Sequence, residues 1–120
     1  MAAGLVTLKR RAEFLRVADA RRKFATPGLV LQSAPRPGGD LRVGYTVSRK
    51  VGNAVVRNRA KRRLRAAAAI VLADHAVAGH DYVVIGREAT PARPFPALRQ
   101  DLETALRRLG LWRESAAGTA

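Results

Sequence analysis

The chain has 120 residues, of which 48% are hydrophobic, as expected for one compact domain with a buried core. Its 23 lysines and arginines outnumber its 9 acids and give a net charge of +14; this favours a polyanionic partner, nucleic acid first and an anionic membrane surface second. The lack of cysteine excludes disulfides and thiolate metal sites. Because no apolar run is long enough for a membrane span or a signal peptide, we expect a cytoplasmic protein.

The N-terminal part of the sequence predicts one helix and two strands. Apolar and basic residues recur at helical spacing from Leu8 to Val17, and Thr7 can cap the start of this helix. The basic stretch 19–26 indicates a connection that leads into a strand at 29–33. Apolar and polar residues alternate over 41–48, which predicts a half-buried strand. We expect this strand to pair with its predecessor as a hairpin.

The C-terminal part predicts two helices separated by a strand. Asn53 can cap a long helix that begins in a basic segment, continues through an alanine-rich one and ends near 74–79. A continuous apolar run within 81–87 is typical of a buried strand. The last helix, about 97–109, is stopped by Gly110. It has apolar residues on one stripe: Leu98, Leu102, Ala105, Leu106 and Leu109.

This order of elements predicts an α+β fold with a single layer of sheet covered by helices, or a split βαβ arrangement. We expect one domain over 1–112. Residues 113–120 have no core-forming pattern and are predicted to be a disordered tail.

The long helix begins with a concentration of positive charge, because eight basic side chains and no acid lie between Arg49 and Arg65. On a helical wheel a narrow apolar face suits packing on a sheet and carries Val56, Ala60, Leu64, Ala67 and Val71. An adjoining arc of about 140° carries Arg57, Asn58, Lys61, Arg62 and Arg65. Like charges four residues apart repel each other, and phosphates would relieve this repulsion. We therefore interpret the arc as a phosphate-binding surface. A merely solvated helix face would need acids among the basic residues. A membrane- or calmodulin-binding helix would need a broader apolar stripe with aromatics.

The segment 42–65, RVGYTVSRKVGNAVVRNRAKRRLR, resembles the signature of the bacterial ribonuclease P protein family. The resemblance continues on both sides and covers roughly residues 5–110. It implies a ribosomal-protein-like two-layer sandwich in which the Arg-Asn-Arg helix joins two parallel strands. The crossover implied by the family is left-handed, whereas the general rule favours right-handed connections.

The resemblance also implies the function of a ribonuclease P protein subunit, which assists the endonucleolytic removal of the 5′ leader from precursor tRNA. In the family the RNA subunit holds the active site and its Mg²⁺, so no catalytic or metal-binding residue is expected in the protein. The implied partners are one ribonuclease P RNA per protein and precursor tRNA, with neither DNA nor membrane, and the free protein is expected to be a monomer. The positions that match the RNA-binding motif are Arg49, Lys50, Asn53, Arg57, Asn58, Arg59, Lys61, Arg62 and Arg65.

A cleft between the first helix and the sheet receives the single-stranded leader in this family. The candidates for it here are Phe14, Val17, Gln32, Arg42 and Tyr45. Phe14 is the clearest match, and it can either stack on an unpaired base or pack in the core. Many relatives have a second aromatic four residues further on, where this chain has Ala18, so leader stacking can be weaker or shifted here.

Three other functions fit parts of the sequence. A self-sufficient nuclease needs clustered carboxylates or histidines, and the spacing of Asp19, Asp74, His75, His80 and Asp81 matches no metal motif. A ribosomal-protein-like module that binds ribosomal RNA is the main alternative, since only the Arg-Asn-Arg signature separates it from ribonuclease P. A helix-turn-helix DNA-binding protein is disfavoured, because strands flank the basic helix.

Overall fold

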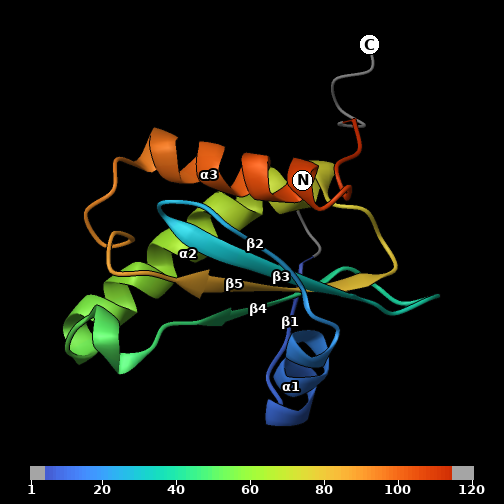
Figure 1. Ribbon diagram of the computed structural model, residues 1–120, viewed down its shortest axis with the longest axis horizontal. Coiled ribbons are helices and arrows are strands. Elements are labelled where there is room, and N and C mark those ends of the chain that lie inside the picture. The colour runs from blue at the N-terminus through green and yellow to red at the C-terminus, as the bar shows by residue number, and fades with distance from the viewer. Residues whose placement is uncertain (1–4, 115–120) are drawn as a thin grey trace.

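The computed structural model describes residues 5–114, which form a five-stranded sheet with helices on both faces (Figure 1). In chain order the elements are β1 (Val6–Thr7), α1 (Arg11–Asp19), β2 (Arg22–Ala25), β3 (Leu29–Pro35), β4 (Arg42–Thr46), α2 (Ala54–His75), β5 (His80–Gly86) and α3 (Phe95–Arg108). A short 3-10 helix, Arg49–Val51, precedes α2. The predicted α+β fold with one helix-covered sheet is confirmed.

The strand β5 lies at the centre of the sheet, whose order is β1-β4-β5-β3-β2. It pairs antiparallel with β3 and parallel with β4. Tyr82, Val83 and Val84 are 0–1% exposed, and a strand that is apolar on both faces needs cover on both. The predicted hairpin of 29–33 with 41–48 is therefore wrong, because β5 separates these two strands. The helix α2 joins two parallel strands that are immediate neighbours, β4 and β5, so no other strand lies inside this βαβ unit. The hand of its crossover stays a prediction.

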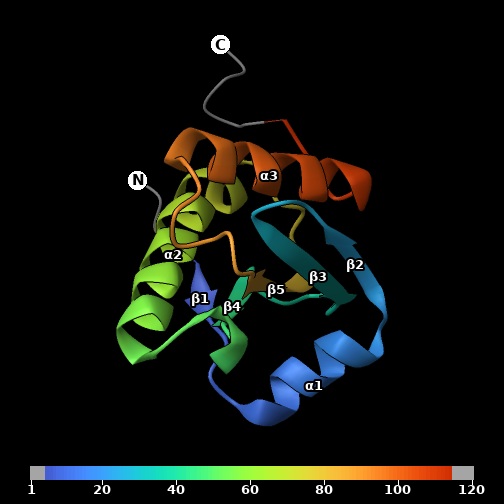
Figure 2. The same cartoon turned by 60° about the vertical axis from the view of Figure 1, so that its left-hand side comes forward.

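The sheet divides the interior into two cores (Figure 2). The main core lies between the sheet and the helices α2 and α3, and contains Leu64, Leu106 and Tyr82. The smaller core lies under α1 and contains Val17 and Val83. Successive β5 residues alternate between the two cores, as side chains on a strand do. Because α1 covers its face alone, few apolar contacts hold it there.

The periodic patterns of the two long helices are confirmed. Four residues of the predicted α2 stripe are buried, namely Ala60, Leu64, Ala67 and Val71. In α3 the buried stripe consists of Leu98, Leu102, Ala105 and Leu106. The Asn53 side chain caps α2 by accepting a hydrogen bond from the Val56 N–H at 3.0 Å. Gly110 follows α3 with a φ of 75°, a left-handed conformation that suits glycine at a helix end.

The first helix begins later than the sequence predicts, at Arg11 instead of Leu8. The Glu13 carboxylate accepts hydrogen bonds from the Lys9 and Arg10 N–H groups at 3.2 and 3.1 Å, which satisfies amides at the helix start. Leu8 is buried in the extended segment before the helix. The cap at Thr7 is thus wrong, because Val6–Thr7 form a parallel strand with β4.

The basic stretch 19–26, predicted as a connection, contains a strand instead. Arg22–Ala25 pair antiparallel with residues 30–33 of β3, and the Thr26 N–H closes the turn on the Leu29 carbonyl at 2.8 Å. The edge of β3 that faces away from β5 offers unpaired backbone groups. Their hydrogen bonds explain why this charged segment becomes β2.

The described chain ends in contact with the C-terminus of α2. The Trp112 ring stacks on His75 with 3.8 Å between centroids. The Arg113 N–H donates to the His75 carbonyl at 2.7 Å, and its guanidinium donates to the Ala76 carbonyl at 2.9 Å. Arg113, placed in the predicted tail, is thus bound to α2, while 115–120 lie outside the described residues.

Candidate nucleic-acid interface

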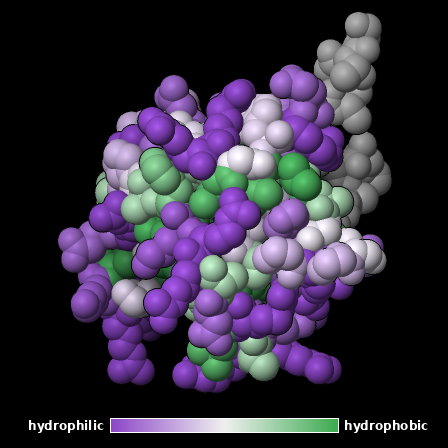
Figure 3. All heavy atoms as spheres, turned by 45° about the vertical axis from the view of Figure 1, so that its right-hand side comes forward, coloured by the Kyte–Doolittle hydropathy of each residue, from purple (hydrophilic) through white to green (hydrophobic). Residues whose placement is uncertain are grey.

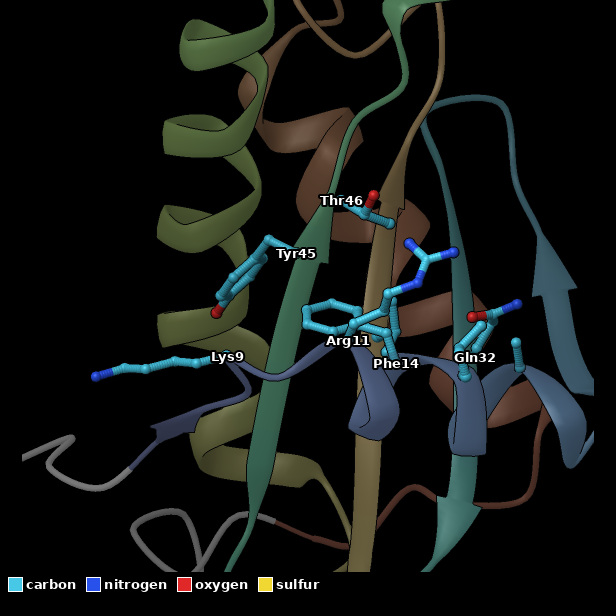
Figure 4. Close-up of a pocket in the computed structure, with 9 residues that line it drawn as sticks. Lys9, Arg11, Phe14, Gln32, Tyr45 and Thr46 are labelled. Carbon is cyan, nitrogen blue, oxygen red and sulfur yellow. The ribbon is translucent and has the colours of Figure 1, made fainter.

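A pocket of about 440 Å³ lies between α1 and the sheet. Figure 4 shows Arg11 and Phe14 projecting from α1 over the sheet, with Tyr45 and Thr46 on β4 and Gln32 on β3. Lys9, Leu15, Ala18 and Val83 complete its lining. The pocket thus combines two aromatic rings and apolar groups with the two cations Lys9 and Arg11. This combination suits an unpaired base and its phosphate.

The Phe14 ring lies directly over the backbone of Gly44. A Cβ atom at position 44 would come within 2.6 Å of two atoms of the ring and 3.1 Å of the Leu8 Cβ. Glycine at this position of β4 therefore makes the room in which the ring lies. A glycine inside an alternating strand is a known sign of close approach, and this signal could have pointed to Gly44, which was not among the predicted site residues.

The structure brings three of the five predicted leader-binding residues together, namely Phe14, Gln32 and Tyr45. It does not bring Val17 to the pocket, because this side chain is 0% exposed and packs in the smaller core. Arg42 lines a neighbouring hollow of about 570 Å³ instead. Lys9, Arg11 and Thr46, which were not predicted, take part in the pocket, and no sequence pattern marked them.

Arg42 belongs to a group of charged residues, Glu13, Arg16, Arg36, Arg42 and Asp81, which we call the Asp81 network. Asp81 is 0% exposed and accepts two hydrogen bonds from Arg42, at 2.8 and 2.7 Å, and one from Arg36 at 3.0 Å. Arg16 of α1 also pairs with Asp81. Arg42 in turn donates to Glu13 of α1 at 2.8 Å.

The Asp81 network attaches α1 to the sheet and so fixes one wall of the pocket. Burial by itself raises the pKa of Asp81, but hydrogen bonds from Arg42, Arg16 and Arg36 outweigh it and lower the pKa to about 2. Asp81 is therefore a carboxylate at neutral pH. The sequence pointed to Asp81 only as a candidate metal ligand, because the arginines that bind it lie 39 to 65 residues away in the chain.

The predicted basic arc occupies the N-terminal half of α2, and we call it the basic α2 surface: Arg57, Asn58, Lys61, Arg62 and Arg65. Asn58, Arg62 and Arg65 are exposed, and Arg57 and Lys61 are half-buried. The Arg57 guanidinium also donates to the Gly52 carbonyl at 2.8 Å. The other predicted RNA-binding residues, Arg49, Lys50, Asn53 and Arg59, are exposed nearby along the same stretch of chain.

Arg63, on the far side of α2, has a structural partner. Its guanidinium donates to the carbonyl of Thr90, at 3.1 Å, and to that of Arg93. These bonds hold the loop before α3 against α2.

Tyr45 connects the basic α2 surface with the pocket. The Arg65 Cζ atom lies 5.4 Å from the centre of the Tyr45 ring, a cation–π distance. Burial raises the pKa of Tyr45, and Arg65 opposes this shift. Since Tyr45 also lines the pocket, the two candidate RNA-binding regions adjoin.

A small α+β domain with a long helix whose N-terminal half is basic and free of acids, beside an aromatic pocket, defines an RNA-binding protein. A model of the family described as Ribonuclease P matches residues 4–110. The chain belongs to the ribonuclease P protein family and is thus a component of a ribonucleoprotein endoribonuclease, in partnership with ribonuclease P RNA. The match decides against the ribosomal-protein alternative.

Individual relatives agree with the family match. The ribonuclease P protein component of Paramagnetospirillum magneticum is 58% identical across 100% of this chain and 94% of its own length. That of Gluconacetobacter diazotrophicus is 52% identical, over 87% of this chain and 90% of its own. Among solved structures, a mutant RNase P protein from Staphylococcus aureus superimposes with a TM-score of 0.75 at 26% identity, covering 88% of each chain. The protein from Thermotoga maritima gives 0.67 at 25% identity, covering 82% of this chain and 92% of its own.

The described residues 5–114 contain no helix that is both long and apolar enough to cross a membrane.

Proposed function

We propose that the basic α2 surface binds ribonuclease P RNA while the pocket under α1 binds the single-stranded 5′ leader of precursor tRNA. The observation that carries this proposal is the junction of the two regions at Tyr45 and Arg65. A strand of RNA in the pocket would lie beside RNA on the helix. The protein would therefore hold the substrate next to the catalytic RNA, which is a positioning role.

The charges on α2 support the assignment to RNA phosphates. None of the five ion pairs found within residues 5–114 includes a residue of the basic α2 surface. These guanidinium and ammonium groups therefore keep donors for an external acceptor. Arginine binds phosphate oxygens in a bidentate way, and each phosphate contact releases a counterion.

The contents of the pocket support the assignment to the leader. Phe14 offers a ring for stacking, while Lys9 and Arg11 offer charge for the adjoining phosphates. Ala18 lines the same pocket, at the position where many relatives have an aromatic. The aromatic rings that remain for stacking in this pocket are those of Phe14 and Tyr45.

We assign the hydrolytic chemistry to the RNA subunit and its Mg²⁺. Magnesium would supply an activated water and stabilise the leaving oxygen. The side chains of residues 5–114 offer no cluster of three His, Asp or Glu that could hold a metal ion, so no step is assigned to the protein. We further propose that the protein is cytoplasmic, that it is a monomer when free, and that one protein binds each ribonuclease P RNA. Purified protein with Mg²⁺ should leave precursor tRNA intact until the RNA subunit is added.

The combined substitution Arg57→Ala and Lys61→Ala tests the α2 assignment. It should weaken assembly with ribonuclease P RNA and lower the slope of log K against log salt by up to about 2 units, one for each phosphate that is no longer bound. Binding measured at four or more salt concentrations gives this slope. The charge-conserving pair Arg57→Lys and Lys61→Arg is the matched control and should keep the wild-type slope. A wild-type slope in the alanine variant would refute the assignment.

The substitution Gly44→Ala tests whether the position of the Phe14 ring matters for leader binding. The new methyl group would displace the ring, so affinity for precursor tRNA should fall by up to the ~1–3 kcal/mol of a base–aromatic stack. Overpacking should also cost about 1–3 kcal/mol of stability, which a melting curve measures. In a Phe14→Ala background the same substitution should have little further effect on affinity and a smaller effect on stability, because the ring is gone and only the 3.1 Å approach to the Leu8 Cβ remains. Equal losses in both backgrounds would contradict this account.

A further inference from the structure

A second group of arginines gathers where α3 ends beside β2, at Arg22, Arg107 and Arg108, which we call the α3-end surface. The Arg22 guanidinium donates to the Leu109 carbonyl at 2.5 Å. The Arg108 Cζ lies 5.7 Å from the centre of the Phe24 ring, so the strand and the helix bring these cations together. Hydrophilic side chains cover most of the molecular face on the side where α3 ends (Figure 3).

The α3-end surface carries more positive charge than its local structure requires. Cations at a helix C-terminus are stabilised by the helix dipole by about 0.3–1 kcal/mol each, which explains one or two arginines there. All three side chains are nevertheless exposed, and none takes part in an ion pair found within residues 5–114. The acids nearest in sequence, Asp19 for Arg22 and Glu103 for Arg107 and Arg108, form no ion pair in that part of the chain either.

The arginines of this surface are already held in place. The Arg107 Cζ lies 3.7 Å from the centre of the Trp112 ring, whose other neighbour is His75 at 3.8 Å. A guanidinium that stacks by its face keeps N–H donors along its edge. Because stacking has restricted the side chain, binding a phosphate costs less conformational entropy.

The α3-end surface and the basic α2 surface lie at opposite sides of the molecule. In Figure 2 the N-terminal half of α2 lies at the left, while β2 and the end of α3 lie at the right. The longest dimension of the Cα trace is 41 Å. Neighbouring phosphates of one strand cannot reach both surfaces.

We propose that the α3-end surface binds the phosphodiester backbone of a second stretch of RNA, so that the protein bridges two RNA segments in the holoenzyme. This inference rests on the proposed function for the other RNA contact. The second stretch belongs either to ribonuclease P RNA or to the mature part of the tRNA, which share this chemistry. This second stretch of RNA is distinct from the leader, because the pocket proposed for the leader lies on the opposite face of the sheet from α3.

The test neutralises this surface with Arg22→Gln, Arg107→Gln and Arg108→Gln in the full chain. Salt slopes are measured for ribonuclease P RNA binding to the protein, and for mature and precursor tRNA binding to the holoenzyme. We expect a slope lower by about 2–3 units for either ribonuclease P RNA or both tRNAs, which identifies the source of the phosphates. The ratio of precursor to mature tRNA affinity should not change, since the pocket is intact.

The matched control replaces the same three residues by lysine, which keeps the charge and loses the planar stacking. It should retain the wild-type slopes, whereas any structural role of the arginines appears as a lower melting temperature in both variants. If the glutamine variant does not fold, the single substitution Arg108→Gln serves as the test, because the Arg108 guanidinium makes no hydrogen bond within residues 5–114. The salt slope of this single variant should fall by up to about 1 unit. Wild-type slopes for all RNAs in the folded variant overturn the inference, as does a lower precursor-to-mature ratio. Failure of the Arg57 and Lys61 test alone would refute the α2 assignment and leave this result standing.

Discussion

Replacing Asp81 by Asn should lower the free energy of unfolding by about 3–5 kcal/mol, the usual cost of removing one partner from a buried charge group. Arg16, Arg36 and Arg42 would then face one another without the carboxylate that accepts their hydrogen bonds. Urea unfolding followed by circular dichroism measures the loss. The first helix should loosen most, because Arg16 belongs to it and few apolar contacts hold it.

The same carboxylate should give the wild-type protein an acid-sensitive stability. The folded pKa of Asp81, about 2, lies below the ordinary value of 3.8, so its contribution is fully present above about pH 4. It is lost as the pH falls toward 2 and amounts to roughly 2 kcal/mol. The Asn variant should lack this component, so the difference in stability between the two proteins should shrink below pH 4.

Two controls make the Asp81 result specific. Asp40→Asn removes an exposed acid and should change stability by less than about 0.5 kcal/mol. Adding Arg36→Gln to the Asp81 variant removes one of the unpaired cations and should recover part of the loss, which is a non-additive outcome. Equal losses for Asp40→Asn and Asp81→Asn, or strict additivity with Arg36→Gln, would show that the Asp81 network does not act as a unit.

Replacing Phe14 by Ala should reduce the affinity of the holoenzyme for leader-bearing precursor by about 1–3 kcal/mol, which corresponds to roughly 5- to 150-fold. Binding of mature tRNA and assembly with ribonuclease P RNA should change little, because neither uses the pocket. Direct binding of precursor and mature tRNA to the reconstituted holoenzyme measures the two tRNA affinities. The ring also packs beside the smaller core, so a large-to-small change can itself cost about 3–5 kcal/mol of stability.

Phe14→Leu separates stacking from packing. Leucine fills much of the same volume, so the melting temperature should lie closer to that of the wild type than to that of Phe14→Ala. It has no aromatic face, so affinity for the leader should remain low. If Phe14→Leu binds precursor as tightly as the wild type, or if a folded Phe14→Ala protein loses assembly and precursor binding equally, then Phe14 is a packing residue.

The fold was predictable from sequence where one segment carries its own periodic signal. The buried stripes of α2 and α3 follow from residues within each helix, as does the cap at Asn53. Strand pairing did not follow, because the partner of β3 is β5, about fifty residues later in the chain. The charged segment that became β2 had no strand pattern of its own, and hydrogen bonding to β3 decided its conformation.

The candidate site also has one part that the sequence predicts and one part that it does not. The basic α2 surface was predictable because one helix carries all of it. The pocket joins α1, β3 and β4, and alternation alone cannot say which side of the sheet each strand residue faces. The structure shows that Arg42 faces Asp81 and that Gly44 lies beneath Phe14. These relations depend on the packing of α1, which no local pattern specifies.

The central position of β5 has a consequence for the order in which the protein is made. When synthesis has reached residue 79, the chain contains β1 to β4, yet these form only two separate two-stranded ladders, β1 with β4 and β2 with β3. Isolated two-stranded ladders are marginally stable in water. Stable tertiary structure must therefore wait until β5 has left the ribosome and inserted between them. Nascent chains stalled before Gly86 would expose β3 and β4 edges together with a highly cationic helix.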